Sequence, residues 1–255
     1  METPRRVLTA IASAPVAALR FEKRRGAILS AVVRVVLIAI VGLATAGVPT
    51  PAGATKPRVL TGGEAVIDSI SALAATGSPA NPNVPSANPG QTITVQGAGL
   101  SSTTFVVMRY TDSQGAFQTT LVTLDSASGD GSSATLTVPM FVNGVYLVTP
   151  LPNAGPSPGA TLQIVPIITG VISTPPMVLF GAGFQEGSTQ NPVSYNAVGS
   201  SVADLSANNG PEINSNSDGV QNSIAILPAS FVPLFPGGGI TVTTSGGTSA
   251  QFALP

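Results

Sequence analysis

The sequence predicts an all-β fold, in which two tandem β-sandwiches follow an N-terminal signal helix. Charged residues make up only 8% of the chain, while glycine and proline number 28 and 23. This composition suits short strands joined by tight turns and does not suit helices. From residue 66 onward, short runs alternate apolar residues with Thr, Ser or Gln, which is the pattern of half-buried strands. The same order of runs then occurs a second time, which indicates two similar domains.

The first 54 residues have the layout of a secretory signal peptide. Seven of the ten Lys and Arg residues lie there, an apolar run covers residues 35–48, and small residues lead up to Ala54. This order predicts cleavage between Ala54 and Thr55. An uncleaved anchor is the alternative, although the run falls short of the ~20 apolar residues that span a bilayer. Residues 55–65 are predicted to be a linker.

The composition of the remaining chain excludes several classes of function. The chain contains no His and no Cys, which removes the commonest general base, the commonest metal ligands, thiol nucleophiles and disulfides. Nine of the eleven acidic residues follow residue 54, against three of the ten basic ones, so we expect no nucleic-acid partner. The acids are scattered singly and no hydrolase motif occurs. We therefore expect no enzyme, no catalytic residues, no cofactor and no bound metal.

The repeat is clearest at two glycine pairs. Gly97-Ala98-Gly99-Leu100 follows the alternating run 92–95, and Gly181-Ala182-Gly183-Phe184 follows the apolar run 177–180. Neither pair has the third glycine of a dinucleotide-binding fingerprint, so both are interpreted as turns or bulges. Other matching runs, in the same order, are 67–70 with 168–171, 134–139 with 224–228, 146–148 with 240–242, and 162–164 with 252–254. Their order predicts one sandwich over 66–165 and a second over 166–255.

The two repeats resemble the IPT/TIG domain, an immunoglobulin-like fold of bacterial surface proteins and receptor ectodomains. The resemblance lies in Pro89-Gly90-Gln91-Thr92-Ile93-Thr94-Val95, in both glycine pairs, and in the run 240–249 with Phe252. The first repeat replaces the G-G-T-S turn by the loop 150–158, and the second lacks the P-G-x-x-[IV]-T strand. The resemblance implies immunoglobulin-like sandwiches with a spacer, adhesion or binding role, and it carries over no catalytic residue.

Two candidate ligand sites fall in the second repeat. Asn214, Asn216 and Asp218 alternate like the oxygen ligands of a calcium loop, but position twelve is Ala225 where a bidentate Glu is needed. An exposed polar turn is the alternative. The polar loop 196–222 presents amides and hydroxyls suited to a glycan, with Tyr195 beside it as the aromatic. Core packing is the alternative for Tyr195.

These observations predict an exported, non-catalytic structural or interaction module that serves adhesion, cell-surface assembly or spacing. The alternative is a secreted glycan-binding module without enzymatic activity. The expected partner is a protein or a polysaccharide at the cell surface, and a membrane only through an uncleaved N-terminal segment. The expected location is secreted or on the cell surface. The identity of the ligand and the oligomeric state stay open at this stage.

Overall fold

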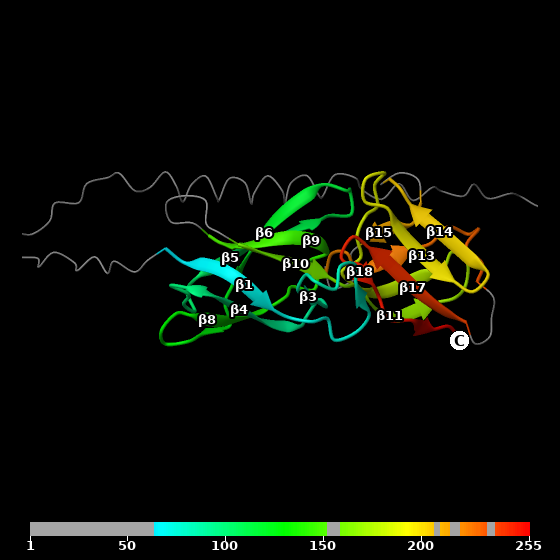
Figure 1. The fold of residues 1–255 in the computed structure, drawn as a ribbon. Coiled ribbons are helices and arrows are strands. Elements are labelled where there is room, and N and C mark those ends of the chain that lie inside the picture. The colour runs from blue at the N-terminus through cyan, green and yellow to red at the C-terminus, as the bar shows by residue number, and fades with distance from the viewer. Residues whose placement is uncertain (1–63, 152–158, 207–209, 215–219, 234–237) are drawn as a thin grey trace, which may run out of the picture. The chain divides into compact units, whose positions relative to one another are not determined.

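The computed structural model describes residues 64–151, 159–206, 210–214, 220–233 and 238–255. Every regular secondary-structure element among these residues is a β-strand. The all-β prediction is therefore confirmed for these residues (Figure 1). Within them, no helix has the length and apolarity needed to cross a membrane. The predicted signal helix, the cleavage site between Ala54 and Thr55, and residues 55–63 of the predicted linker lie outside the described residues.

The first half of the described chain forms two antiparallel layers. One sheet has the order β1-β4-β8-β7, and the other has the order β3-β10-β9-β5-β6, with one parallel pair between β3 and β10. Figure 1 shows these layers one above the other. The strands are β1 (Val66–Ser71), β2 (Ser78–Pro79), β3 (Ser86–Ala87), β4 (Thr92–Ala98), β5 (Phe105–Thr111), β6 (Phe117–Thr123), β7 (Ser126–Ala127), β8 (Ser133–Thr137), β9 (Gly144–Pro150) and β10 (Ala160–Ile164).

The second half repeats this plan with two further sheets, in the orders β11-β12-β16-β15 and β14-β13-β17-β18-β2, with β19 also paired to β17. Its strands are β11 (Ile167–Ile172), β12 (Val178–Ala182), β13 (Val193–Ala197), β14 (Ser200–Asp204), β15 (Glu212–Asn214), β16 (Ile224–Ile226), β17 (Gly239–Thr244), β18 (Gly247–Thr248) and β19 (Phe252–Ala253). Strand β2, from the first half, therefore completes a sheet of the second half by pairing with β18.

Each half buries its own set of apolar side chains between its sheets. The first set includes Ile67, Val95, Leu136 and Leu162, and the second includes Leu179, Phe184, Tyr195 and Val242, all 1% exposed or less. The strands supply these residues by alternation, because every second side chain points to the same face of a sheet. The described residues therefore form two hydrophobic cores.

The same structural feature, a bulge in a strand pairing, explains the glycine pair in each half. The β1–β4 pairing shifts register between Ile67 and Ser69, and the β11–β12 pairing shifts between Ile168 and Gly170. At each bulge a glycine lies against the neighbouring backbone. A Cβ on Gly97 would lie 1.8 Å from the Val66 oxygen, and one on Gly181 would lie 2.0 Å from the Ile167 oxygen. The repeated glycines thus mark repeated bulges, where no side chain fits.

Candidate binding face

The outer face of strands β9, β5 and β6 is apolar. In the β5–β6 hairpin, Phe105 pairs with Thr123, Val107 with Leu121, and Thr111 with Phe117, so these side chains share one face. Thr149 joins that face by pairing with Val107, and alternation along β9 adds Leu147 and Val145. Leu151 extends it, because its N–H donates a 2.7 Å hydrogen bond to the Phe105 oxygen. The opposite face of the same strands supplies Val106, Met108 and Val148 to the core.

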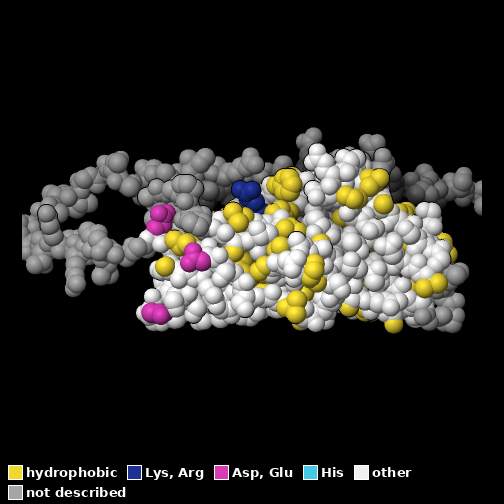
Figure 2. All heavy atoms as spheres, in the orientation of Figure 1, with side chains coloured by type: hydrophobic (Ala, Val, Ile, Leu, Met, Phe, Trp, Pro, Cys, Tyr) yellow, Lys and Arg dark blue, Asp and Glu magenta, His cyan; other side chains and the backbone are white. Residues whose placement is uncertain are grey.

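The hydrophobic side chains of this face are open to solvent. Six of them are at least 36% exposed, with Phe117 at 69% and Leu147 at 52%; the others are Phe105, Leu121, Val145 and Leu151. We call these six residues the apolar face. Figure 2 shows hydrophobic side chains beside the one dark-blue patch on this side of the molecule. Arg109, which pairs with Thr119 on the same face, is the only Lys or Arg in the part of the chain that the structure describes.

The opposite sheet of the same half shows what an ordinary outer face looks like here. Its cross-strand pairs are Thr92 with Thr137, Thr94 with Thr135, and Gln96 with Ser133. Their hydroxyls also hydrogen-bond one another, since the Oγ1 atoms of Thr92 and Thr137 lie 3.1 Å apart. Apolar residues inside and polar residues outside are the usual pattern of an antiparallel sheet. The apolar face departs from this pattern, and a departure of this kind typically marks a contact surface.

Local hydrogen bonds fix the hairpin that presents Phe117. The Asp112 carboxylate accepts 2.9 Å bonds from the N–H groups of Gln114 and Ala116, and its second oxygen accepts one from the Gln118 side chain. Gly115 completes the turn at φ 75°, a conformation that glycine adopts without strain. The Phe117 ring then meets Tyr146 edge-on, with ring centroids 6.4 Å apart. The exposed phenyl group is therefore held in place by its turn and by an aromatic neighbour.

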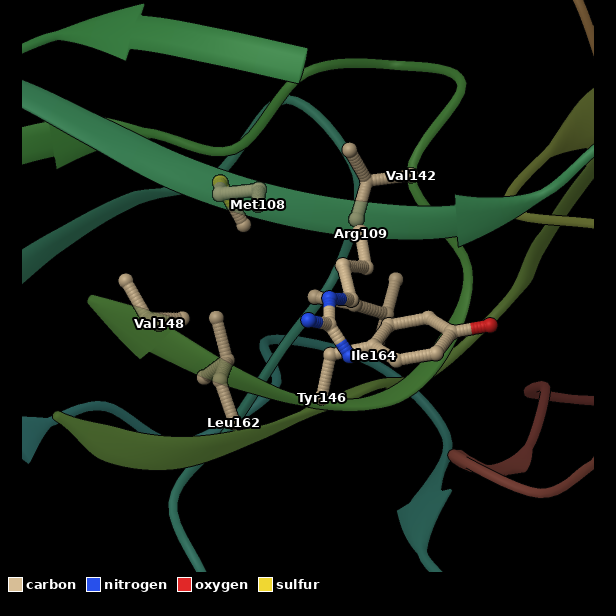
Figure 3. A pocket seen from close by; sticks show the side chains of 7 residues that line it. All are labelled: Met108, Arg109, Val142, Tyr146, Val148, Leu162 and Ile164. Carbon is tan, nitrogen blue, oxygen red and sulfur yellow. The ribbon is translucent and has the colours of Figure 1, made fainter. Parts of the chain in front are cut away.

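Tyr146 and Arg109 connect the apolar face to the core. They line one small hollow together with Met108, Val142, Val148, Leu162 and Ile164 (Figure 3). This hollow is too small for a water molecule, so it is a packing gap and offers no ligand site. The Tyr146 hydroxyl lies 2.8 Å from the Thr111 hydroxyl, and burial raises the pKa of Tyr146. Tyr146 is thus a neutral anchor beneath Phe117.

A larger hollow lies at the end of the apolar face. It holds about 250 Å³ and is lined by Phe105 and Leu151 together with Ala65, Gly99, Ser101, Thr103 and Thr104. The Ser101 hydroxyl lies 3.0 Å from that of Thr103 and 3.1 Å from that of Thr104. The Phe105 ring and the neighbouring hydroxyl groups together suit a polar, ring-shaped ligand.

Of the four residues singled out from the sequence, the structure describes Tyr195 and Asn214. Tyr195 is 0% exposed and belongs to the second core, which corresponds to the core-packing alternative, and its hydroxyl has no hydrogen-bond partner. Asn214 is exposed at the end of β15, where its oxygen accepts a bond from the Ser223 N–H. Asn216 and Asp218 lie outside the described residues. Among the described residues, no three His, Cys, Asp or Glu side chains group as metal ligands.

A buried pair of carboxyl groups is the second unusual feature, and no pattern in the sequence indicates it. Glu186 is 4% exposed and Asp204 is 0% exposed. Asp204 accepts a 2.8 Å bond from the Gly187 N–H and a 3.3 Å bond from the Ser206 N–H, whereas Glu186 Oε1 has no partner. Burial and the neighbouring Asp204 raise the pKa of Glu186 to about 8, and burial also raises the pKa of Asp204. Glu186 therefore keeps its proton at neutral pH in the folded chain.

None of the six residues of the apolar face was predicted from the sequence as a candidate site. The sequence did contain a signal for them. Residues 105–108 and 145–148 are continuous apolar runs, whereas a half-buried strand would alternate apolar and polar residues. Such runs predict burial on both faces of a strand. Within the described residues, only one face of these strands is covered, and the surplus side chains make the apolar face.

Comparison with known proteins identifies no family. No family model and no curated protein matches the chain, so the IPT/TIG resemblance stays a prediction. A surface glycan-binding protein of Prevotella bryantii matches 74% of this chain and 42% of its own, at 14% identity and a TM-score of 0.35. One from a xyloglucan utilization locus of Bacteroides uniformis matches 74% and 48%, at 14% identity and a TM-score of 0.24.

A further match is SGBP-B from a mixed-linkage glucan utilization locus of Bacteroides ovatus, in complex with a mixed-linkage heptasaccharide. It matches 66% of this chain and 39% of its own, at 20% identity and a TM-score of 0.22. The chain thus spans less than half of the length of each of these structures. All three TM-scores are below 0.5, so these similarities assign no function to the chain.

Proposed function

We propose that the chain is an exported, non-catalytic interaction module that docks a protein partner of the cell surface through its apolar face. One observation carries this proposal: six large hydrophobic side chains, all at least 36% exposed, share one face of one sheet. Contiguous apolar patches on soluble proteins are usually interaction sites. The IPT/TIG resemblance implies the same class of role.

The chemistry of the apolar face favours a protein over a sugar as the main ligand. Phe and Leu side chains with a single Arg are typical of the centre of protein interfaces, where other charges are depleted. Sugars stack on aromatic rings and need many hydrogen bonds, whereas four of the six exposed residues are aliphatic. Phe117 and Leu147, the most exposed of the six, are therefore the expected anchors.

Binding of the purified exported chain to isolated cell envelopes tests the proposal. Phe117→Ser and Leu147→Ser should each weaken binding by about tenfold, the effect of losing ~1.4 kcal/mol at an anchor position. Leu73→Ser is the matched control, because Leu73 is 72% exposed but lies outside the apolar face. Equal binding by all three variants and the wild type would exclude this face as the docking surface.

Glycan binding is the second candidate, and the hollow beside Ser101, Thr103 and Phe105 is the observation that favours it. Its hydroxyls offer hydrogen-bond donors and acceptors, and Phe105 offers a ring for stacking. A panel of soluble polysaccharides tests this candidate by calorimetry. Thr103→Val should abolish saturable binding if the hollow is the site, and it leaves the apolar face unchanged.

A further inference from the structure

Strand β6 has a free edge in the described part of the chain. It is the last strand of its sheet and pairs only with β5. The Asp112 N–H bonds the Ala116 oxygen, and the Leu124 N–H bonds the Thr104 oxygen. Because bonded and non-bonded pairs alternate along an antiparallel ladder, the even-numbered residues of β6 face β5. Phe117, Thr119, Leu121 and Thr123 therefore point their N–H and C=O groups away from the sheet.

The other described edge strands carry features that hinder pairing with another chain. Strands β1 and β11 each contain a bulge, β3 and β7 have two residues each, and β15 has three. Strand β14 ends in Asp204. In contrast, β6 runs for seven residues with no register shift, no proline and no charge. A long, regular, uncharged edge is the kind that adds a further strand.

We propose that two copies of this chain associate through their β6 edges, in antiparallel register about a two-fold axis at Thr120. This register sets Phe117 opposite Thr123 of the second copy, and Thr119 opposite Leu121. Every free backbone group of β6 then meets a partner group, because the outward-pointing residues all face one another. The two five-stranded sheets become one continuous sheet, and both apolar faces lie on the same side of it.

Pairing of the two β6 edges also joins the two apolar faces. Three strands of seven residues cover roughly 20 Å by 15 Å, or about 300 Å², so the joined face covers about 600 Å². The inference rests on the proposed function to this extent, since a partner would meet the joined face in the dimer and a single apolar face in the monomer.

Charge does not oppose this association. The residues of β6 carry no charge, and Arg109 lies on β5, one strand further from the axis. Two copies of Arg109 would be separated by three strand spacings, which is about 14 Å. At physiological salt this exceeds the screening length of about 8 Å, so their repulsion is weak.

Sedimentation equilibrium of the chain, as purified after export, tests the proposal. The wild type is expected to show a concentration-dependent dimer. Thr119→Pro removes an outward N–H without removing a bond to β5, and it should give a monomer, while Thr119→Ala keeps the N–H and should remain dimeric. A monomeric wild type at the highest soluble concentration, or a dimeric Thr119→Pro variant, overturns the proposal.

A cysteine placed on the axis gives a second test that does not depend on how proline is tolerated. The chain has no cysteine, and the proposed register sets Thr120 opposite itself in a non-bonded pair, with Cα atoms about 4.5 Å apart. That separation permits a disulfide. Thr120→Cys should form covalent dimers under oxidation, whereas Thr94→Cys, on the other sheet, should not. Equal cross-linking of both variants contradicts the register.

These variants also separate the dimer from the docking function. Thr119→Pro leaves Phe117 and Leu147 in place, so a monomeric variant should still bind envelopes through each apolar face. Loss of the dimer with envelope binding retained supports both proposals. If the protein dimerises but Phe117→Ser does not weaken envelope binding, the β6 association is supported and the proposed docking function is contradicted.

Discussion

The side chain of Asn222 donates a 3.0 Å hydrogen bond to the backbone oxygen of Thr111, although the two residues lie 111 positions apart. The same amide donates a 2.9 Å bond to the Phe141 oxygen, and Asn143 in turn bonds both Thr111 and the Phe184 oxygen. Asn222 is fully buried. Two buried asparagines therefore tie β5, in the first half, to backbone that follows β12 in the second.

The first prediction concerns Asn222, which adopts φ 56°. Asn222→Ala should lower the free energy of unfolding by about 2–4 kcal/mol, because it removes two buried bonds and places alanine in the left-handed region. Asn222→Gly also removes the bonds but tolerates this φ, so its loss should be smaller by about 1 kcal/mol. Urea denaturation measures both values. Unchanged stability in both variants would show that these bonds contribute nothing to the fold.

The second prediction is a fall in stability as pH rises. The folded state raises the pKa of Glu186 from 4.5 to about 8, and the pKa of Asp204 is raised as well. Between these pH values the folded chain holds a proton that the unfolded chain has released, so a rise in pH favours unfolding. The melting temperature should therefore fall from pH 5 to pH 8.

Glu186→Gln is the test of that assignment, because it removes the titrating group while keeping the shape. Its melting temperature should depend much less on pH in this range. Asp130→Asn is the matched control, since hydrogen bonds from Ser128 and Ser132 lower the pKa of the exposed Asp130 to about 2. The Asp130 variant should keep the wild-type slope, and a flat wild-type profile would contradict the buried pair.

The third prediction separates binding from folding at two phenylalanines. Phe117 is 69% exposed, so Phe117→Ala should change the free energy of unfolding by no more than about 0.5 kcal/mol. Phe184 is 0% exposed, and Phe184→Ala should cost about 3–5 kcal/mol. Denaturant titration of both variants provides the comparison. A large loss at Phe117 would mean that its ring stabilises the fold.

The fourth prediction concerns the bulge glycines. A Cβ on Gly97 would lie 1.8 Å from the Val66 oxygen, whereas the site of a Cβ on Gly129 is open. Gly97→Ala should therefore destabilise the chain by at least about 2 kcal/mol, because the β1–β4 ladder must shift. Gly129→Ala should be within about 0.5 kcal/mol of the wild type. Thermal unfolding of the two variants decides whether the bulge is rigid.

The fifth prediction follows from the sequence of the N-terminal segment. Export should yield a mature chain that begins at Thr55, because small residues precede that position after an apolar run. The intact mass of the chain recovered from the culture medium or the envelope measures the cut. A mass that includes residues 1–54 would support the anchor.

The sequence by itself determined several of the strands, their order along the chain, and the two glycine pairs, which are interpreted as turns or bulges. Alternation in runs such as 92–95 predicts a half-buried strand, and Gly97 and Gly181 recur at the same point of each repeat. These features depend on residues close together along the chain, so local sterics and the two-residue period of a strand specify them.

Only the tertiary structure decided which surfaces stay exposed and which distant groups meet. The run 145–148 predicts burial, but the fold leaves Val145 and Leu147 in solvent. Strand β2 joins the sheet of the other half, and Glu186 lies buried beside Asp204. Each of these outcomes depends on how the sheets pack against one another. That packing is set by the sum of many long-range contacts, and no local pattern in the sequence records it.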